Sequence, residues 1–184
     1  MINPYIIGEH IYLRHPTEED ARGRWYQWFS DEETMKYLGD RYWPNCVEDQ
    51  LGFYRSLIND KSKLVLSIIS KSDDSHIGVL GLSNINWVHR YADATMVVGE
   101  KSYRKMPYTF EAHDLLHKVA FLKLNLLNLK SSYAESSKAS HGMQHAFKYK
   151  KVGVYENLLC IGGKREHVYV GVLSRDDYLK SKGL

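Results

Sequence analysis

The hydrophobic residues of the chain follow two spacings, and together these predict strands and helices in a mixed order. Short apolar or alternating runs predict strands at residues 6–14, 63–70, 76–86, 95–98, 129–134, 154–161 and 167–173. Apolar residues three and four positions apart predict one helix after residue 17 and others at 47–59, 107–120 and 139–151. Because strands come before, between and after helices, we expect an α/β fold in which helices flank a mixed sheet.

Residues 92–120 place a basic turn between a strand and a helix. The strand ends at Gly99, the turn contains Arg104 and Lys105, and Pro107 suits a first helical position, where its missing N–H would have no partner. At such a junction, unpaired backbone N–H groups and the positive end of the helix dipole point at one place. The stretch therefore predicts a site for a nucleotide-type pyrophosphate.

Size and composition are those of an ordinary globular protein. The 184 residues fit one domain, 1–184, with 43% hydrophobic and 26% charged residues. A formal net charge of +3 gives little reason to expect a nucleic-acid partner. Cys46 and Cys160 lie far apart, which favours a reducing compartment over a disulfide framework. The chain start does not read as a signal peptide, and no apolar run has the roughly 20 residues of a membrane span, so we expect a cytoplasmic protein without a membrane partner.

The basic turn resembles the acyl-CoA pyrophosphate motif of the GCN5-related N-acetyltransferase (GNAT) superfamily, Arg/Gln-x-x-Gly-x-Gly/Ala. Arg104 stands at the first position, Pro107 at the first glycine and Thr109 at the second small residue. The segments 11–21 and 77–82 also resemble GNAT segments, and Tyr103-Arg104 and Glu111-Ala112 are similar to the branch with ribosomal-protein and small-molecule acetyltransferases. The likeness spans nearly the whole chain.

This resemblance implies a GNAT fold with a mostly antiparallel, twisted sheet of about seven strands and about four helices. It implies an acetyl-CoA-dependent N-acetyltransferase in which a primary amine attacks directly in a ternary complex. The acceptor stays open between a nucleotide-linked amino sugar, another small amine and a protein N-terminus. We expect acetyl-CoA as co-substrate, no metal, and a monomer or homodimer.

The family layout assigns the co-substrate to backbone groups on two elements. Strand residues Met96, Val97 and Val98 would meet the thioester, and a β-bulge there would expose amides that act as an oxyanion hole. Gly142 would let the pantetheine arm pass close to a helix. The pyrophosphate would lie on the turn and the first helical turn, at Arg104, Lys105, Met106, Pro107, Tyr108 and Thr109.

Tyr149 is the candidate proton donor to the coenzyme sulfur. The segment from Tyr149 to Val154 resembles the family segment Tyr-x-Lys-x-Gly-Phe at the end of the fourth helix. A phenol with a pKa near 10 suits protonation of a thiolate. Helical spacing would align Tyr149 with Gly142, His145 and Ala146. The alternative is a half-buried structural tyrosine.

Glu135 is the candidate general base, because the family layout places it at the end of the strand that faces this site. His89, Tyr91, Asp93 and Glu156 are weaker candidates, and each carboxylate also fits a solvated charge. Water relays or the equilibrium of the amine itself can replace a dedicated base.

Acceptor recognition is assigned to aromatic residues of the early helices and of the turn at 87–91, because aromatic faces with polar tips suit sugars, nucleobases and peptides. Absence of an acidic cluster disfavours polyamines. The alternative for Trp25 and Trp28 is a role in the core. The residues assigned to the acceptor are Trp43, Trp87, His89 and Tyr91, with Arg41 and Tyr42 beside them.

Two further hypotheses compete with this function. His113-Asp114-Leu115-Leu116-His117 resembles the HExxH metal motif, but aspartate is too short and no third ligand is evident, which disfavours a metal. Pro107 and Thr109, where the family has small residues, favour a GNAT-fold module that binds without catalysing. A CoA enzyme with a longer acyl group is a third possibility.

Overall fold

The computed structural model describes residues 1–38 and 43–184, so the acceptor roles expected for Arg41 and Tyr42 lie outside the described residues. Three further helical stretches interrupt or extend the α-helices: η1 (Ala21–Trp25), η2 (Lys101–Tyr103) and η3 (Val119–Lys123). In chain order the other elements are β1 (Ile6–Ile7), β2 (Ile11–Arg14), α1 (Glu18–Asp20), α2 (Tyr26–Trp28), α3 (Glu32–Met35), α4 (Val47–Leu57), β3 (Leu64–Ser70), β4 (His76–Asn86), β5 (Tyr91–Val98), α5 (Tyr108–Lys118), β6 (Asn128–Ala134), α6 (Lys138–Ala146), β7 (Lys150–Ile161), β8 (Lys164–Ser174) and α7 (Arg175–Lys182).

One sheet of eight strands runs through the described chain in the order β1-β2-β3-β4-β5-β6-β8-β7. All neighbours pair antiparallel except β5 and β6, which are parallel. This confirms the mixed, mostly antiparallel sheet. The strand expected at 6–14 is two strands, because a turn closes there with Gly8 N–H donating to the Ile11 carbonyl.

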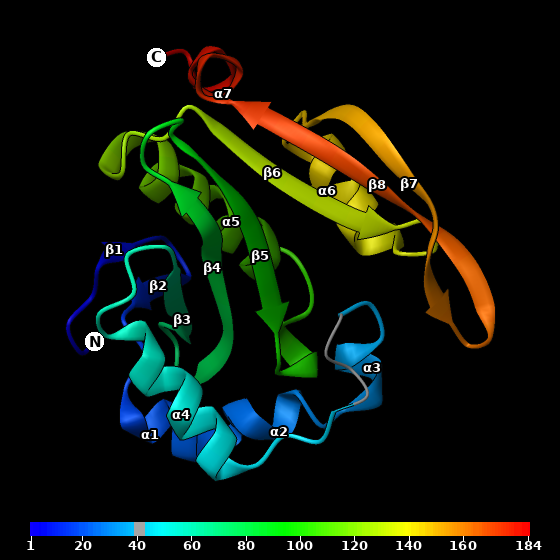
Figure 1. Cartoon of the computed structure of the whole chain (residues 1–184). Helices are drawn as coiled ribbons and strands as arrows, with labels where there is room; N and C mark the ends of the chain where they lie inside the picture. The colour runs from blue at the N-terminus through cyan, green and yellow to red at the C-terminus, as the bar shows by residue number, and fades with distance from the viewer. Residues whose placement is uncertain (39–42) are drawn as a thin grey trace.

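β5 and β6 pair over only three residues each, and this decides where a ligand could enter the sheet. Tyr91–Asp93 pair with Asn128–Lys130, and beyond that point β5 continues to Val98 and β6 to Ala134 without a bridge between them. Figure 1 shows the two strands side by side at one end and far apart at the other. We call the last paired position, Asp93 with Lys130, the vertex, and the space between the strands the gap.

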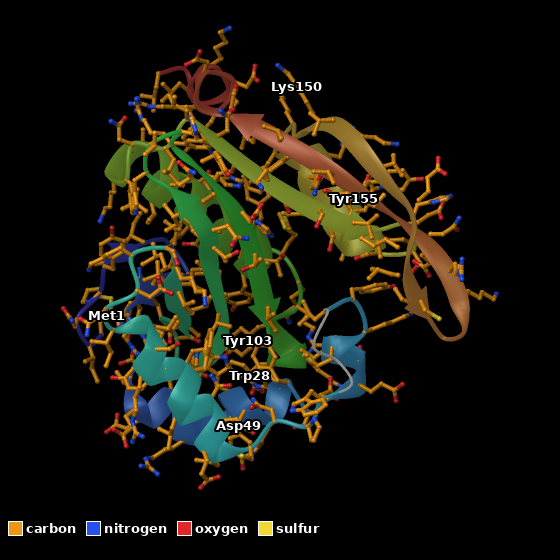
Figure 2. All side chains as sticks on the ribbon, viewed as in Figure 1. Met1, Trp28, Asp49, Tyr103, Lys150 and Tyr155 are labelled. Carbon is orange, nitrogen blue, oxygen red and sulfur yellow. The ribbon has the colours of Figure 1, made fainter. Side chains whose placement is uncertain are left out.

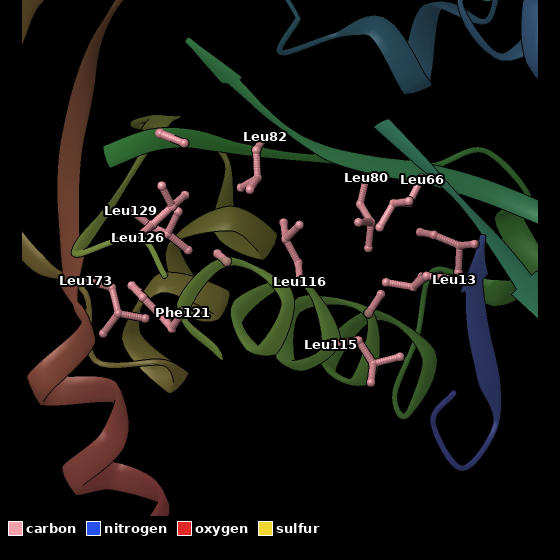
Figure 3. Close-up of a cluster of buried hydrophobic side chains, with 14 of the residues drawn as sticks. Leu13, Leu66, Leu80, Leu82, Leu115, Leu116, Phe121, Leu126, Leu129 and Leu173 are labelled. Carbon is pink, nitrogen blue, oxygen red and sulfur yellow. The ribbon is translucent and has the colours of Figure 1, made fainter. Parts of the chain in front are cut away.

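Helices cover the two faces of the sheet, and each face has its own apolar core. α5 and η3 pack behind the sheet, where Leu80 and Leu82 of β4 meet Leu115, Leu116 and Phe121 in the larger core (Figure 3). On the opposite face, η1, α2 and α4 bury Trp25, Trp28, Leu51 and Leu57 against Val79 of β4. The strict alternation along β4 therefore holds both helical layers in place.

Helix α6 ends five residues before the predicted bound of 151, and this corrects the expected position of Tyr149. Lys148 has a left-handed conformation (φ 59°), Lys148 N–H donates to the His145 carbonyl and Tyr149 N–H to the Gln144 carbonyl. These bonds form a Schellman motif, which terminates a helix. Tyr149 therefore follows the helix and is not aligned with Gly142 along it.

Two helices were absent from the sequence prediction, although both carry capping signals. Asp31 accepts a bond from Thr34 N–H at the start of α3, and Ser174 accepts one from Asp177 N–H at the start of α7. Gly183 ends α7 with φ 69°. Among the helices of the described chain, none has the length and apolar character needed to cross a membrane.

Candidate active site

The edge of β5 that faces the gap carries backbone groups that no neighbouring strand uses. Gly99 N–H donates to the Ile77 carbonyl, and bonded positions alternate along an antiparallel pair, so Thr95 and Val97 bond to β4. Ala94 N–H makes the last bond to β6, at Lys130, and beyond it Met96 and Val98 direct their N–H and C=O groups into the gap. Within residues 1–38 and 43–184, the N–H of Met96 has no hydrogen-bond partner.

The prediction of a β-bulge at Met96–Val98 is wrong. The register there is regular, with Met96 opposite Leu80 and Val98 opposite Gly78. The irregularity between β4 and β5 lies instead between Ser83 and Asn86, in the β4 segment that contains Asn84 with φ 50°. The parting of β5 from β6, rather than a bulge, exposes the amides.

The first turn of α5 supplies a second group of free donors beside the end of β5. Pro107 is the N-cap, so the helix starts at Tyr108, and no side chain caps it. Thr109 N–H bonds to the Lys105 carbonyl at 3.3 Å. In the described chain the N–H groups of Lys105, Met106, Tyr108 and Phe110 make no hydrogen bond. Free N–H groups at the positive end of an eleven-residue helix form a site suited to an anion.

Arg104 and Lys105 were both expected to contact the pyrophosphate, but Arg104 makes its hydrogen bonds within the protein. The Arg104 guanidinium donates from Nε to the Val98 carbonyl (2.8 Å) and from Nη2 to the Gly99 carbonyl (3.0 Å) and to Thr34 Oγ1. Lys101 pairs with Glu33 at 2.7 Å. Lys105 is exposed and makes no ion pair with the part of the chain that the structure describes. Arg104 therefore ties the loop to β5 and α3, and Lys105 is left for a ligand.

Helix α3 and the residues after it bridge the open end of the gap. Thr34 contacts Arg104 beside β5, and the Tyr37 hydroxyl donates to the Ser136 carbonyl beyond β6 at 3.2 Å. In Figure 1, α3 lies between the open ends of the two strands. A cavity of about 290 Å³ lies between α2, α3 and the residues that follow β5, and it is lined in part by Trp28, Thr34 and Gly99. Figure 2 shows Trp28 and Tyr103 together at the end of β5.

Tyr149 enters the core beneath the vertex. Its Cβ lies against Gly171 of β8. Gly171 pairs with Ser131 of β6, which follows Lys130, the last β6 residue that pairs with β5. Its hydroxyl is 2.9 Å from Nε2 of His117 on α5. Burial raises the pKa of Tyr149 above its usual value of 10, and burial lowers the pKa of His117 to about 3. The pair is therefore neutral around pH 7.

Gln144 and Gly142 of α6 differ in burial. Gln144 is buried against Gly171, and its Nε2 has no partner among the described residues. Sequence analysis did not select Gln144; its signal is the position five residues before Tyr149, at the start of the Schellman turn. Gly142 is exposed, and among the described residues no atom lies within 4 Å of the site of an added Cβ.

Glu135 lies at the open end of β6 and not at the vertex. Its Oε1 accepts a hydrogen bond from the Tyr169 hydroxyl at 3.3 Å, and the next residue, Ser136, donates to Glu166 at 2.7 Å. Asp93, at the vertex, pairs with Lys130 at 3.0 Å. Glu156 is exposed on β7.

The four residues assigned to the acceptor lie in two places. Trp87 and His89 are exposed in the turn before β5, and Tyr91 begins that strand with Lys130 over its ring. Trp43 is 81% exposed ahead of α4. The eight residues of β5 span roughly 25 Å, so the turn at Trp87 lies at the vertex end, far from the pyrophosphate loop. Trp25 and Trp28 are core residues, as their alternative reading held.

His113 and His117 share a helical face, with 6.1 Å between ring centroids, and both rings contact Phe147. Asp114 pairs with Lys118 and Lys182. No group of three or more His, Cys, Asp or Glu residues suited to a metal ion occurs in residues 1–38 and 43–184. That the protein needs no metal stays a prediction.

Comparison with known proteins identifies the family. The profile described as "Acetyltransferase (GNAT) domain" matches residues 10–148, so the chain belongs to the GNAT acetyltransferase family and is an acetyl-CoA-dependent N-acyltransferase. A search of curated proteins gives no match.

Solved structures share the fold at low sequence identity. Spermidine N-acetyltransferase from Vibrio cholerae, in complex with CoA and spermine, superposes with a TM-score of 0.85 at 17% identity, over 94% of this chain and 99% of that chain. A GNAT-family acetyltransferase from Bacillus anthracis superposes with a TM-score of 0.79 at 16% identity, over 93% and 98% of the two chains. These likenesses confirm the GNAT fold.

Proposed function

We propose that this protein transfers the acetyl group of acetyl-CoA to the primary amine of a small aliphatic molecule, by direct attack in a ternary complex. One observation carries the proposal: the N–H groups on the free edge of β5 run toward the free N–H groups at the start of α5. These two sets of donors form one line along which an extended amide chain ending in a pyrophosphate would fit.

The chain's own residues fit the co-substrate despite Pro107. Donors on both sides of the proline, at Lys105, Met106, Tyr108 and Phe110, would hold the pyrophosphate with the Lys105 ammonium beside them. Met96 and the N–H of Val98 would pair with the pantetheine amides as a neighbouring strand would. Acetyl-CoA supplies the activated acetyl group. The Met96 N–H is the candidate donor to the carbonyl oxygen as charge develops on it.

The acceptor amine is assigned to the open end of β6, because carboxylates without a cationic partner lie there. Glu135 and Glu166 make no ion pair with any described residue. Glu135 precedes Ser136 in the chain, and Glu166 accepts a hydrogen bond from the Ser136 hydroxyl. Carboxylates attract the ammonium groups of aliphatic amines. The sequence expectation against polyamines rested on the absence of an acidic cluster in the linear chain. Folding brings Glu135 and Glu166 together, so polyamines belong among the acceptors, as spermine accompanies CoA in the Vibrio cholerae structure.

The roles proposed for the ionisable groups follow from their positions. Glu135 would anchor an ammonium group of the acceptor or accept the proton that the attacking amine releases, through water. Tyr149 would give a proton to the sulfur from below the vertex.

A thiol-release assay tests the proposal. Purified protein would receive acetyl-CoA with each of a panel: spermidine, a monoamine of similar length, a nucleotide-linked amino sugar and an N-terminal peptide. We expect the highest kcat/KM with an aliphatic amine, and a higher KM with little change in kcat for Glu166→Gln. Thiol release with the amino sugar or peptide alone would overturn the acceptor assignment, and no CoA binding by calorimetry would overturn the function itself.

A further inference from the structure

His117 is a buried polar side chain in an aromatic core, and Tyr149 is its hydrogen-bond partner. The residue has no exposed surface, and its ring meets Phe147 edge-on at 4.6 Å between centroids. Nε2 lies 2.9 Å from the Tyr149 hydroxyl, and Nδ1 has no partner among the described residues. Burying a polar group in apolar surroundings costs free energy of folding unless hydrogen bonds compensate for the lost contact with water.

The role proposed for Tyr149 decides which nitrogen of His117 must carry the hydrogen. In one tautomer the Tyr149 hydroxyl donates to Nε2, and Nδ1 is a buried N–H without an acceptor among the described residues. In the other, Nε2–H donates to the Tyr149 oxygen, and the phenolic hydrogen and the Nδ1 lone pair have no partner in the described chain. A phenol that gives its proton to a ligand must not donate that hydrogen to His117, so the acid role of Tyr149 requires the second arrangement, with the hydrogen of His117 on Nε2. The phenol keeps its own hydrogen free for another acceptor.

The path of the tyrosine ring places that free hydrogen under the vertex. Tyr149 Cβ lies against Gly171 of β8, and its hydroxyl reaches His117 of α5, which lies behind the neighbouring half of the sheet. The ring therefore crosses beneath the place where β5 and β6 part. The free edge of β5 starts there, after Ala94.

We propose that His117 is a positioning residue: its Nε2–H holds the Tyr149 oxygen so that the phenolic hydrogen is presented to the vertex, and it stabilises the phenolate that forms. This rests on the proposed function. The amine nitrogen bonds to the acetyl carbon as the carbon–sulfur bond breaks, and Tyr149 gives its proton to the sulfur. The nitrogen releases one proton to water, and a proton from water restores the phenol, so no proton is gained or lost overall.

The tautomer can be measured directly in the unmodified protein. Nitrogen-15 NMR of ¹⁵N-histidine-labelled protein should show a protonated Nε2 and an unprotonated Nδ1 for His117, whether or not an acceptor is known. A protonated Nδ1 would overturn the proposal even if thiol release is robust. Loss of thiol release with every amine would instead contradict the proposed function and leave the tautomer result standing.

Kinetics of matched variants test the consequence. His117→Phe should lower kcat about 10²-fold, near the level of Tyr149→Phe, with the KM for acetyl-CoA changed less than about twofold. His117→Gln, whose Nε2 can still donate, should recover part of the loss. The double variant should lose no more than either single one, because the two residues act as a unit. His113→Phe, one turn away without a bond to Tyr149, should keep kcat. A folded His117→Phe protein with unchanged kcat would overturn the proposal.

Discussion

The Arg104 guanidinium donates to the Val98 carbonyl at the end of β5, with 2.8 Å between Nε and O. The same side chain contacts Thr34 on α3, so one residue fixes the pyrophosphate loop, the strand end and the bridge over the gap. In the family pattern this arginine marks the phosphate loop; here its charge is held inside the fold.

Removal of Arg104 should therefore cost stability. Arg104→Ala deletes charged hydrogen bonds to two carbonyl oxygens, and we expect a loss of about 2 kcal/mol in the free energy of unfolding. The control is Arg22→Ala, which removes an exposed pair with Glu18 and should cost no more than about 0.5 kcal/mol. Urea unfolding curves measure both. Equal, small losses would show that Arg104 does not secure the loop.

Lys105 should act on the ligand rather than on the fold. Lys105→Ala should weaken CoA binding by about 1 kcal/mol at low salt, and less at high salt, because an exposed charge is screened. Its unfolding free energy should match the unmodified protein. Calorimetry at two salt concentrations measures the affinity, with Lys164→Ala, at the exposed β7–β8 turn, as control. A salt-independent loss, or none, would contradict a direct phosphate contact.

The Met96 N–H can be removed without breaking the ladder between β4 and β5. Proline is tolerated where a strand edge is unpaired, and Met96 directs its N–H into the gap. Met96→Pro should lower kcat about 10²-fold or more if this N–H stabilises the developing oxyanion. Met96→Ala removes the side chain but keeps the N–H, and should retain most of kcat. If the alanine variant loses as much as the proline variant, the side chain and not the amide is responsible.

As the pH is lowered, the free energy of unfolding should begin to fall at a pH well above the pKa values of the carboxyl groups. Burial lowers the pKa of His76 to about 4, against the pull of Asp20, and that of His117 to about 3. The unfolded chain binds protons at these residues below about pH 6.5 and the folded one does not, so stability is full above that pH and falls as pH falls.

Urea unfolding at pH 7, 6 and 5 measures this effect. Each of the two histidines should contribute about 1.4 kcal/mol of loss per pH unit below about pH 6.5. His76→Gln should reduce the slope by that amount. Burial raises the pKa of Asp20, but bonds from Arg14 and Thr17 and the charge of His76 bring it below the usual value, so Asp20 contributes only at lower pH. A flat stability between pH 7 and pH 5 would contradict the buried, neutral state of both histidines.

Periodicity was sufficient to predict the long elements. β4 has its predicted bounds because it alternates between two apolar cores, and the stripe on α5 meets the sheet as expected. The end of α6 was not predictable from composition. The segment from Tyr149 to Val154 was expected at the end of a helix, yet Gly153 lies in β7 opposite Val170, and Lys148 takes the left-handed position that glycine usually holds.

The candidate site was predictable only where it consists of backbone groups at the ends of predicted elements. Backbone donors follow from strand and helix ends, so the region of Met96 and of residues 105–109 could be named in advance, whereas Phe110 was not. Long-range side-chain contacts could not: Tyr149 with His117, Arg104 with Thr34, and Tyr37 with Ser136 join residues between 32 and 99 positions apart.

The central claim is that main-chain N–H groups of β5 and of the start of α5 bind the coenzyme. Amide proton–nitrogen NMR spectra recorded during titration with CoA test it most directly. The account predicts the largest shifts at Met96, Lys105, Met106, Tyr108 and Phe110, with little change at Gly162 and Gly163 in the β7–β8 turn. Shifts gathered around the cavity at Trp28 and Glu100, with Met96 and Tyr108 unchanged, would contradict it.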